Sequence, residues 1–175
     1  MSEVKIAIMD AAEQRMRLGG FGGFSFREIA ADVGIKSSSV HYHFPTKENL
    51  AAAVIRRWAQ AVSQHVDEAL AKDPDPIRVW TKIFRGTAMS EPSMCPCTVL
   101  GAASQDLPEE VSSEVKGFFK MCLDKLVARG LSQSKAAEFL STLTGALVVA
   151  NALRDPTAYD RATCDLLRRR EEAVA

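Results

Sequence analysis

The sequence has almost no pattern that predicts β-strands, and it lacks the short motifs that mark common enzyme classes. No run of alternating β-branched residues lies between tight turns. The phosphate-binding loop, the dinucleotide-binding turn, and the signatures of zinc proteases and serine hydrolases are all missing. These absences argue against a β-rich fold and give no sign of catalysis. We therefore predict an all-α protein that is not an enzyme.

The chain also lacks an excess of either charge and an apolar run of membrane length. Of its 175 residues, 22 are Lys or Arg and 22 are Asp or Glu, so the formal net charge is zero. An excess of basic residues would favour nucleic-acid binding, and it is absent. Binding also depends, however, on where the charges lie on the surface. No apolar run approaches the roughly 18 residues that a membrane span needs, and no signal-peptide pattern is visible. We expect a cytoplasmic protein with no membrane partner.

Aromatic residues and cysteines are few. Aromatics make up 7% of the chain, whereas hydrophobic residues make up 47% and alanine is plentiful. Alanine has the highest intrinsic helix propensity, so this mixture favours a helical core. The cysteines Cys95, Cys97, Cys122 and Cys164 are too scattered for a small-domain disulfide framework.

Helical signals recur from one end of the chain to the other. Residues 3–18 place Ile8, Ala12 and Met16 on one face, and glycines follow them. Further helical stretches follow, and some of them are long and apolar. Prolines and glycines, which end helices, separate one stretch from the next. We predict about nine helices.

Two short helices separated by Gly34 form the most informative segment. Ser25 followed by Glu28 predicts a capping box at the start of the first, and Pro45 ends the second. The small Ala30 and the inward Val40 fit a helix-turn-helix. The outer face of the second helix carries hydroxyls, imidazoles and a phenol, which are groups that contact phosphates and base edges. These candidate DNA-binding residues, with a cation from the next helix, are Lys36, Ser37, Ser38, Ser39, His41, Tyr42, His43 and Lys47.

The His-Tyr-His triplet has three other interpretations. Histidine pairs that bind a metal on a helix prefer a spacing of three or four, whereas His41 and His43 are two positions apart with no third ligand nearby. No nucleophile or carboxylate is matched to either histidine, which argues against catalysis. A purely structural alternative lets His43 pack in the small core while His41 is solvated. We expect no metal and no cofactor.

The segment FSFREIAADVGIKSSSVHYHFPTKENL resembles the DNA-binding signature of the tetracycline-repressor (TetR) family of bacterial regulators, and AIMDAAEQRMRLGGFGGFS resembles its first helix. The resemblance implies a three-helix DNA-binding domain over residues 1–50 and a helical effector-binding and dimerisation domain over residues 51–175. Carried over by position, it places Lys36 to Ser39 and His41 in the groove, with Tyr42 and Lys47 on the DNA backbone. Where many members have Tyr and Gly, this chain has His41 and Ser38.

A regulator of this kind implies three partners: a palindromic double-stranded operator, a second copy of the chain and a small-molecule effector. The stretch AAEFLSTLTGALVVANAL, residues 136–153, is too apolar for one wetted helix. We interpret it as a dimer helix, and the alternative is a plain buried core helix. The seam predicted for the dimer interface consists of Leu140, Leu143, Leu147 and Ala150.

The effector pocket is predicted from bulky side chains with few charges among them, which implies a largely apolar or aromatic effector. The candidates are Trp58, Trp80, Phe84, Met89, Cys95, Phe118 and Met121. The overall prediction is a homodimeric DNA-binding regulator, most simply a repressor released by its effector. A rival is a helical ligand-binding protein that does not bind DNA.

The stretch MCPCTVLGAASQDLP adds a further alternative. It resembles a segment of family members that sense electrophiles or oxidants through cysteine, and its spacing to Asp-Leu-Pro favours Cys95 over Cys97. A helix N-terminus beyond Pro96 would lower a thiol pKa. The plainer alternative is a pair of small buried side chains, because free cysteine usually behaves as a hydrophobic residue.

Overall fold

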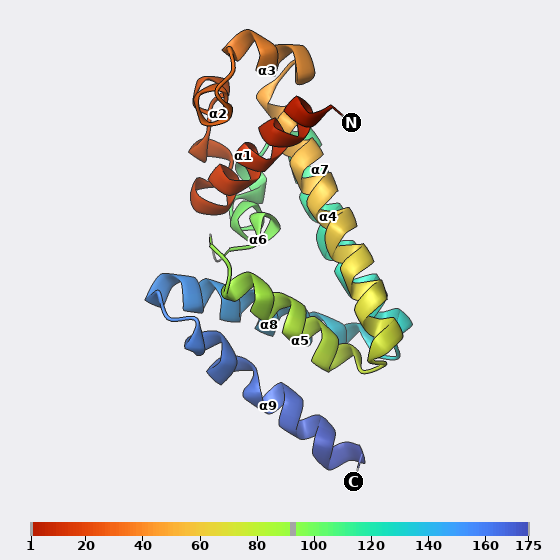
Figure 1. Ribbon diagram of the computed structural model, residues 1–175. Coiled ribbons are helices and arrows are strands. Elements are labelled where there is room, and N and C mark those ends of the chain that lie inside the picture. The colour runs from red at the N-terminus through yellow and green to blue at the C-terminus, as the bar shows by residue number, and fades with distance from the viewer. Residues whose placement is uncertain (1, 92–93, 175) are drawn as a thin grey trace. The chain divides into compact units, whose positions relative to one another are not determined.

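The computed structural model describes residues 2–91 and 94–174, and for Ser104 and residues 168–174 it describes the backbone only. Within these residues the chain forms nine α-helices, two 3₁₀ turns and no strand (Figure 1). The all-α prediction is confirmed. The elements are α1 (Glu3–Gly19), η1 (Phe21–Gly23), α2 (Phe26–Val33), α3 (Ser37–His43), α4 (Lys47–Lys72), α5 (Pro76–Ala88), α6 (Pro96–Gly101), η2 (Ser104–Asp106), α7 (Glu109–Ala128), α8 (Gln133–Leu153) and α9 (Thr157–Val174).

Several helices begin at a side chain that accepts a hydrogen bond from one of their first free N–H groups. Ser25 accepts from the Glu28 N–H at 3.3 Å, and its hydroxyl donates to the Glu28 carboxylate at 2.7 Å. The capping box predicted at Ser25 and Glu28 is therefore present. Thr46 caps α4 by accepting from Asn49, and Ser132 caps α8 by accepting from Lys135.

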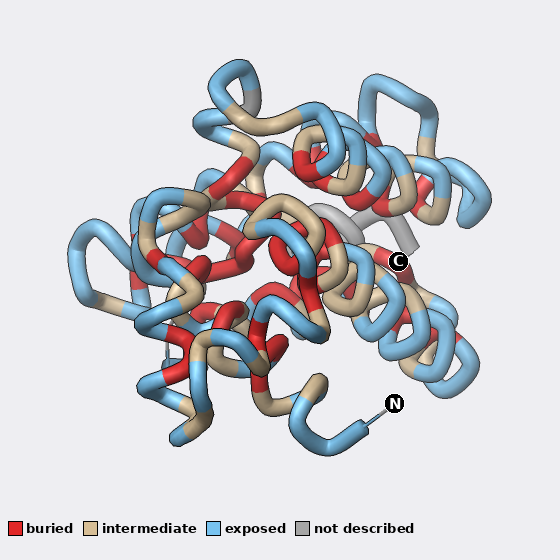
Figure 2. Tube along the Cα trace, turned by 90° about the horizontal axis from the view of Figure 1, so that it is seen from above, coloured by how far each residue is buried: buried red, intermediate tan, exposed pale blue. Residues whose placement is uncertain are grey.

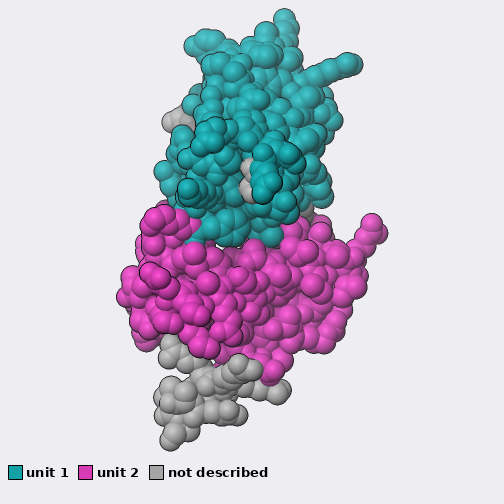
Figure 3. Space-filling view, turned by 180° about the vertical axis from the view of Figure 1, so that it is seen from behind, with its two compact units in different colours: residues 1–60, 95–119 teal, residues 61–94, 120–175 magenta. Residues whose placement is uncertain are grey.

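Backbone contacts divide the chain into two compact units (Figure 3). Unit 1 comprises residues 1–60 and 95–119, and unit 2 comprises residues 61–94 and 120–175. The boundary predicted at residue 50, between a DNA-binding domain and an effector-binding domain, stays a prediction. It falls inside α4, which continues past that residue without a break.

Unit 1 has a core of aliphatic and aromatic side chains on the inner sides of its helices, which appear as red stretches in Figure 2. α6 packs on α1, and Val99 of α6 lies 3.4 Å from where a side chain at Gly20 would begin. Polar contacts join α4 to α7: the Asn49 amide donates to Glu110 at 2.9 Å, and Arg56 pairs with Glu114. These contacts therefore connect the two chain segments that make up unit 1.

Unit 2 is built on packing of α5, α8 and α9. The Tyr159 hydroxyl, buried under α5, donates to the Thr81 carbonyl at 3.0 Å. Burial, with Asp160 next to it, raises the pKa of Tyr159 well above its usual value, against a smaller opposing effect of Arg85. At the surface, Arg85 holds Asp160 through two hydrogen bonds of 2.6 and 2.9 Å. Side chains on α9 thus fix it to α5.

The side of α8 that is predicted as the dimer seam is covered within the single chain, and its role in a dimer stays a prediction. Leu140, Leu143, Leu147 and Ala150 are at most 5% exposed in the single chain, because α5 and α9 cover them. Both sides of α8 are apolar, so composition did not reveal which side the chain itself would bury. By length and composition α8 is also the one helix in the described part that could cross a membrane, although soluble core helices pass the same test.

Candidate nucleic-acid interface

α2 and α3 form a helix-turn-helix held by a small buried core. Ile29, Ala30, Val40 and Phe44 are at most 4% exposed, and Val40 faces inward as predicted. Gly34 ends α2 in the left-handed region at φ 74°, which costs glycine little. The next N–H, from the residue after Gly34, bonds to the Ala30 carbonyl at 2.9 Å and closes the turn.

The outer face of α3 is polar and uncovered. Lys36, Ser38, His41 and Tyr42 are exposed, and Tyr42 is 84% exposed, which is unusual for an aromatic side chain. Ser37, Ser39 and His43 are half-buried. His41 stands edge-on to Phe26 of α2, with ring centroids 4.6 Å apart, and His43 stands edge-on to Tyr42. The structure thus brings the predicted residues of α3 onto one surface, and their contacts with DNA stay a prediction.

Two acidic residues of α2 pair with one arginine of α1. Arg15 donates to both carboxylate oxygens of Asp32, at 2.5 and 3.0 Å, and to Glu28 at 3.1 Å. The hydrogen bonds from Arg15 are the main cause that lowers the pKa of Asp32. The Ser25 hydroxyl is the main cause that lowers the pKa of Glu28, and Arg15 adds to it. The same contacts lock α1 against α2.

A second arginine pairs with two further carboxylates. Arg57 of α4 pairs with Asp10 at 2.7 Å and with Glu13 at 3.0 Å, both on α1. Four of the six acidic residues among the first 50 are therefore held in ion pairs by Arg15 and Arg57. Each arginine carries one positive charge against two carboxylates, so these pairs offset half of the negative charge of the four acids.

Two cationic side chains of the helix-turn-helix form no ion pair with the described residues. Arg27 and Lys36 are exposed and have no ion pair or ring contact within the described part of the chain. By contrast, the Lys47 ammonium lies over the rings of Phe21 and Phe24, 4.6 and 4.7 Å from their centroids. The sequence analysis missed Arg27, although its place in the first turn of a helix that opens the motif was a usable signal.

A polar, uncovered second helix on a packed helix-turn-helix, within an all-α chain, defines a DNA-binding regulator. Residues 8–54 match the profile of the bacterial regulatory proteins of the tetR family. The HTH-type transcriptional regulator LmrA of Bacillus subtilis (strain 168) is 26% identical over 161 residues, which cover 86% of this chain and 85% of that protein. These matches support a regulator of the TetR family.

Solved structures agree over nearly the whole chain. A TetR transcriptional regulator from Legionella pneumophila is 26% identical with a TM-score of 0.88, and covers 97% of this chain and 98% of its own. A TetR-family regulator from Agrobacterium tumefaciens is 26% identical with a TM-score of 0.88, over 95% and 96% of the two chains. The reduced form of NemR from E. coli, 19% identical with a TM-score of 0.81 over 94% and 96%, shares the fold. Regulators of this family are generally non-enzymatic DNA-binding proteins.

The predicted effector residues fall into two groups. Trp58, Cys95 and Phe118 belong to unit 1, whereas Trp80, Phe84, Met89 and Met121 belong to unit 2. Within unit 2 the rings of Trp80 and Phe84 pack with centroids 6.1 Å apart. Met89 is 43% exposed. Their role in binding an effector stays a prediction.

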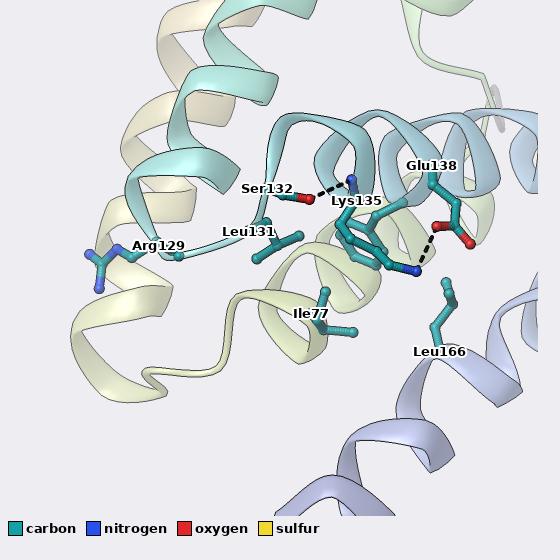
Figure 4. A pocket seen from close by; sticks show the side chains of 9 residues that line it. Ile77, Arg129, Leu131, Ser132, Lys135, Glu138 and Leu166 are labelled. Atoms are coloured by element: carbon teal, nitrogen blue, oxygen red, sulfur yellow. Dashed lines mark hydrogen bonds and ion pairs between the residues drawn. The ribbon is translucent and has the colours of Figure 1, made fainter.

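A cavity of about 370 Å³ lies elsewhere in unit 2, between the starts of α5 and α8 and the middle of α9 (Figure 4). Its walls include Ile77, Leu131, Phe139 and Leu166, and none of the predicted effector residues lines it. Lys135 crosses it to pair with Glu138 at 3.0 Å. The position of this cavity depends on which side chains meet across three helices, so it could not be predicted from sequence.

Several buried polar atoms lack hydrogen-bond partners in the described part of the protein. They are Trp58 Nε1, Trp80 Nε1 and Thr81 Oγ1. Leaving such a group unpaired costs about 1–3 kcal/mol, and an unpaired buried group in a native structure is a candidate for a ligand contact. Two of them, in Trp80 and Thr81, are neighbours on α5.

Cys95, Cys97 and Cys122 are buried, Cys164 is half-buried, and none forms a disulfide. Burial alone would raise the pKa of the Cys95 thiol. Hydrogen bonds from the Cys97 thiol, from the N–H groups of Thr98 and Cys97 and from the Thr98 hydroxyl oppose burial and bring that pKa down to about 7. Among the described residues no group of three or more His, Cys, Asp and Glu side chains is placed to hold a metal ion.

Proposed function

We propose that this TetR-family regulator is a homodimeric, sequence-specific repressor that acts in the cytoplasm and is released by a small, largely apolar effector. The observation that carries the DNA-binding role is the outer face of α3, beside which Arg27 and Lys36 are free cations. Phosphate contacts by such cations would position the protein, and Ser38 and His41 would read base edges.

The second copy would bind at the outer side of α8. Val148, Val149 and Leu153 are 47%, 49% and 62% exposed, and only 39% of the most apolar window of this helix is buried. Gly145 lies on the same side and allows close approach of a second helix. Apolar surface that one chain leaves wet is favourably covered by its two-fold mate, and helix-turn-helix proteins usually bind DNA as dimers.

The DNA-binding proposal is tested by selecting duplexes from a random pool and measuring their affinity by fluorescence anisotropy. We expect a palindrome with half-sites about 10 base pairs apart, or a small multiple of that spacing, bound by two chains. Replacing one half-site should weaken binding at least about tenfold. Enrichment of no sequence, or one chain bound to an asymmetric site, would contradict the proposal and favour the rival ligand-binding protein.

The effector would shift the population toward a conformer whose two α3 helices no longer match successive major grooves. Trp80 and Thr81 support an effector that carries a hydrogen-bond acceptor, because their buried side-chain donors lack partners. Titration of Trp fluorescence with candidate aromatic esters, against a Trp80→Phe variant, tests this. Equal response of both proteins would remove Trp80 from the site.

A second candidate mechanism is a thiol response at Cys95, which its pKa of about 7 favours. In the reaction with a maleimide, the Cys95 thiolate forms an S–C bond with one alkene carbon and the other carbon takes a proton from water. We expect faster labelling of Cys95 than of Cys122, with a loss of operator affinity that Cys95→Ser abolishes. Equal slow labelling of both thiols, read by mass spectrometry, would leave them as buried hydrophobic groups.

A further inference from the structure

The first residue of α4 is a lysine, and this is an unfavourable place for a cation. The aligned peptide dipoles give the start of a helix a partial positive charge, which repels a positive side chain. Glu48 beside Lys47 has the favourable sign, but no ion pair joins Lys47 to any described residue. The position of its ammonium therefore has another cause.

Two phenylalanine rings hold the Lys47 ammonium. Its Nζ lies 4.6 Å from the ring centroid of Phe21 and 4.7 Å from that of Phe24. Both distances are within the roughly 6 Å over which the face of a ring attracts a cation. The two rings stand at 85° to each other with centroids 6.3 Å apart, so the ammonium lies between two walls. This attraction does not neutralise the charge, and Lys47 remains a full cation.

The two rings are themselves fixed by different means. Phe24 is 2% exposed and belongs to the core of unit 1, whereas Phe21 is half-buried in the 3₁₀ turn η1 that follows α1. Gly20 opens this turn at φ 64°, and the Gly23 N–H closes it by donating to the Gly20 carbonyl at 3.1 Å. A Cβ at Gly23 would lie 3.0 Å from the Arg15 carbonyl oxygen. The glycines thus let the turn pack closely against α1, which holds the ring of Phe21 in place.

Restricting a lysine before it meets a partner has a consequence for binding. A lysine ammonium ends a flexible four-carbon stem, so it ordinarily loses much conformational freedom when it contacts a partner. The two rings already restrict Lys47, whereas Lys36 is exposed and has no ring contact among the described residues. A charged group that is held in its bound position binds more tightly, because less freedom remains to be lost on contact.

We propose that Phe21 is a positioning residue for DNA binding: with Phe24, its ring holds the Lys47 ammonium where it contacts one phosphate of the DNA backbone. Phe21 acts through Lys47 and needs no DNA contact of its own. A phosphate is the expected acceptor, because a lysine ammonium is a point charge and phosphate contacts carry no base pattern. The role rests on the proposed DNA binding, and it adds the turn after α1 to the residues on which that binding depends.

The test is a double-mutant cycle on an operator selected from the random pool, read by fluorescence anisotropy. Phe21→Leu should weaken binding about tenfold, since each of two bound chains loses one cation–π contact. In the Lys47→Ala background the same change should have an effect of less than about twofold. Phe21→Tyr keeps the ring and should bind like the wild type. Phe119→Leu, at another half-buried ring of unit 1, is the matched control and should also bind like the wild type.

A second measurement reads the position of Lys47 without DNA. Protons above the face of a ring are magnetically shielded, so the ε-methylene signal of Lys47 should lie upfield of the signals of the other lysines. In protein with labelled lysines, Phe21→Leu should move this signal back toward the others. Circular dichroism checks that each variant is folded, and Phe21→Met takes the place of a leucine variant that does not fold.

Three results would overturn the positioning role alone. They are a Lys47 signal at the position of the exposed Lys36, a folded Phe21→Leu variant that binds the operator like the wild type, and equal weakening by Phe21→Leu with and without Lys47. The last result would show that Phe21 supports the fold and does not act through the lysine. Wild-type protein that binds no duplex would instead refute the DNA binding on which the role rests, and the lysine signal would still report whether the rings hold Lys47.

Discussion

Arginine has two different roles in unit 1. Arg15 and Arg57 each hold two carboxylates and stabilise the packing of α1, whereas Arg27 is exposed and engages no acid in the described structure. The formal sum of charges over the first 50 residues hides this difference, because a paired and a free guanidinium count alike. A polyanion responds to the free charges, so placement and not net charge decides affinity.

Removing a free cation should weaken binding to every duplex alike. For Arg27→Ala and for Lys36→Ala we expect the slope of log affinity against log salt to flatten by about one, because one phosphate contact is lost. The measurement is anisotropy across a salt series. Lys116→Ala, which removes an exposed lysine of α7, serves as control and should leave the slope unchanged. A change in sequence preference with an intact slope would reassign the residue to base reading.

The ion pairs of Arg15 predict a pH dependence of the N-terminal domain. The pKa of Asp32 is lowered in the folded state, so its contribution is present above the unfolded value near 3.8 and is lost as the pH falls through the folded value. Arg15→Gln should make the unfolding midpoint less steeply dependent on pH below about 4. Urea unfolding at several pH values measures this, and parallel curves for both proteins would contradict it.

α8 shows that one helix can serve two surfaces. Its inner side, with Leu143 and Leu147, is covered by α5 and α9, and its outer side keeps Val148 and Val149 exposed. The helix is apolar nearly all round, which a single chain does not need. A second chain against the outer side gives the exposed valines a physical reason.

The two sides predict opposite results for the same kind of substitution. Val149→Glu should give a folded monomer, because the charge is exposed in one chain and buried unpaired only in the dimer. Leu147→Glu should instead unfold the chain, because Leu147 is fully buried. Sedimentation velocity and circular dichroism separate the cases. Val127→Glu, at a valine 39% exposed on α7, is the matched control and should stay dimeric; a dimeric Val149→Glu would place the interface elsewhere.

At the scale of the whole molecule, the two tyrosines of the chain lie in opposite environments. Tyr159 is fully buried and its hydroxyl bonds to the Thr81 carbonyl, whereas Tyr42 is 84% exposed on α3. The first therefore contributes to the core of unit 2, and the second is free to contact a partner.

Replacing each tyrosine by phenylalanine removes one hydroxyl and should separate the two functions. Tyr159→Phe should lower the free energy of unfolding by about 1–2 kcal/mol, because it leaves a buried carbonyl with one bond fewer. Tyr42→Phe should change stability by less than about 0.5 kcal/mol and weaken binding to all duplexes. Chemical denaturation and anisotropy measure the two effects. Reversed effects would show that both roles are assigned wrongly.

The sequence by itself determined the fold class, the helix breaks and the helix-turn-helix, because these depend on local signals. The capping serine Ser25, the left-handed Gly34 and the inward Val40 act within a few residues, and their effects do not require knowledge of distant parts of the chain. The polar outer face of α3 follows from the same periodicity. The residues of the family signature are therefore those at which the local sequence and the tertiary packing favour the same structure.

Only the tertiary structure decided which charges are neutralised and which apolar side of α8 is inward. Arg15 meets Asp32 across 17 positions and Arg57 meets Glu13 across 44, so no local pattern pairs them. Leu147 and Val149 are both apolar, so the sequence does not distinguish them. Leu147 is buried where α8 packs on α5 and α9, whereas Val149 stays exposed. Both outcomes depend on contacts between distant segments, which a single sequence does not specify by periodicity.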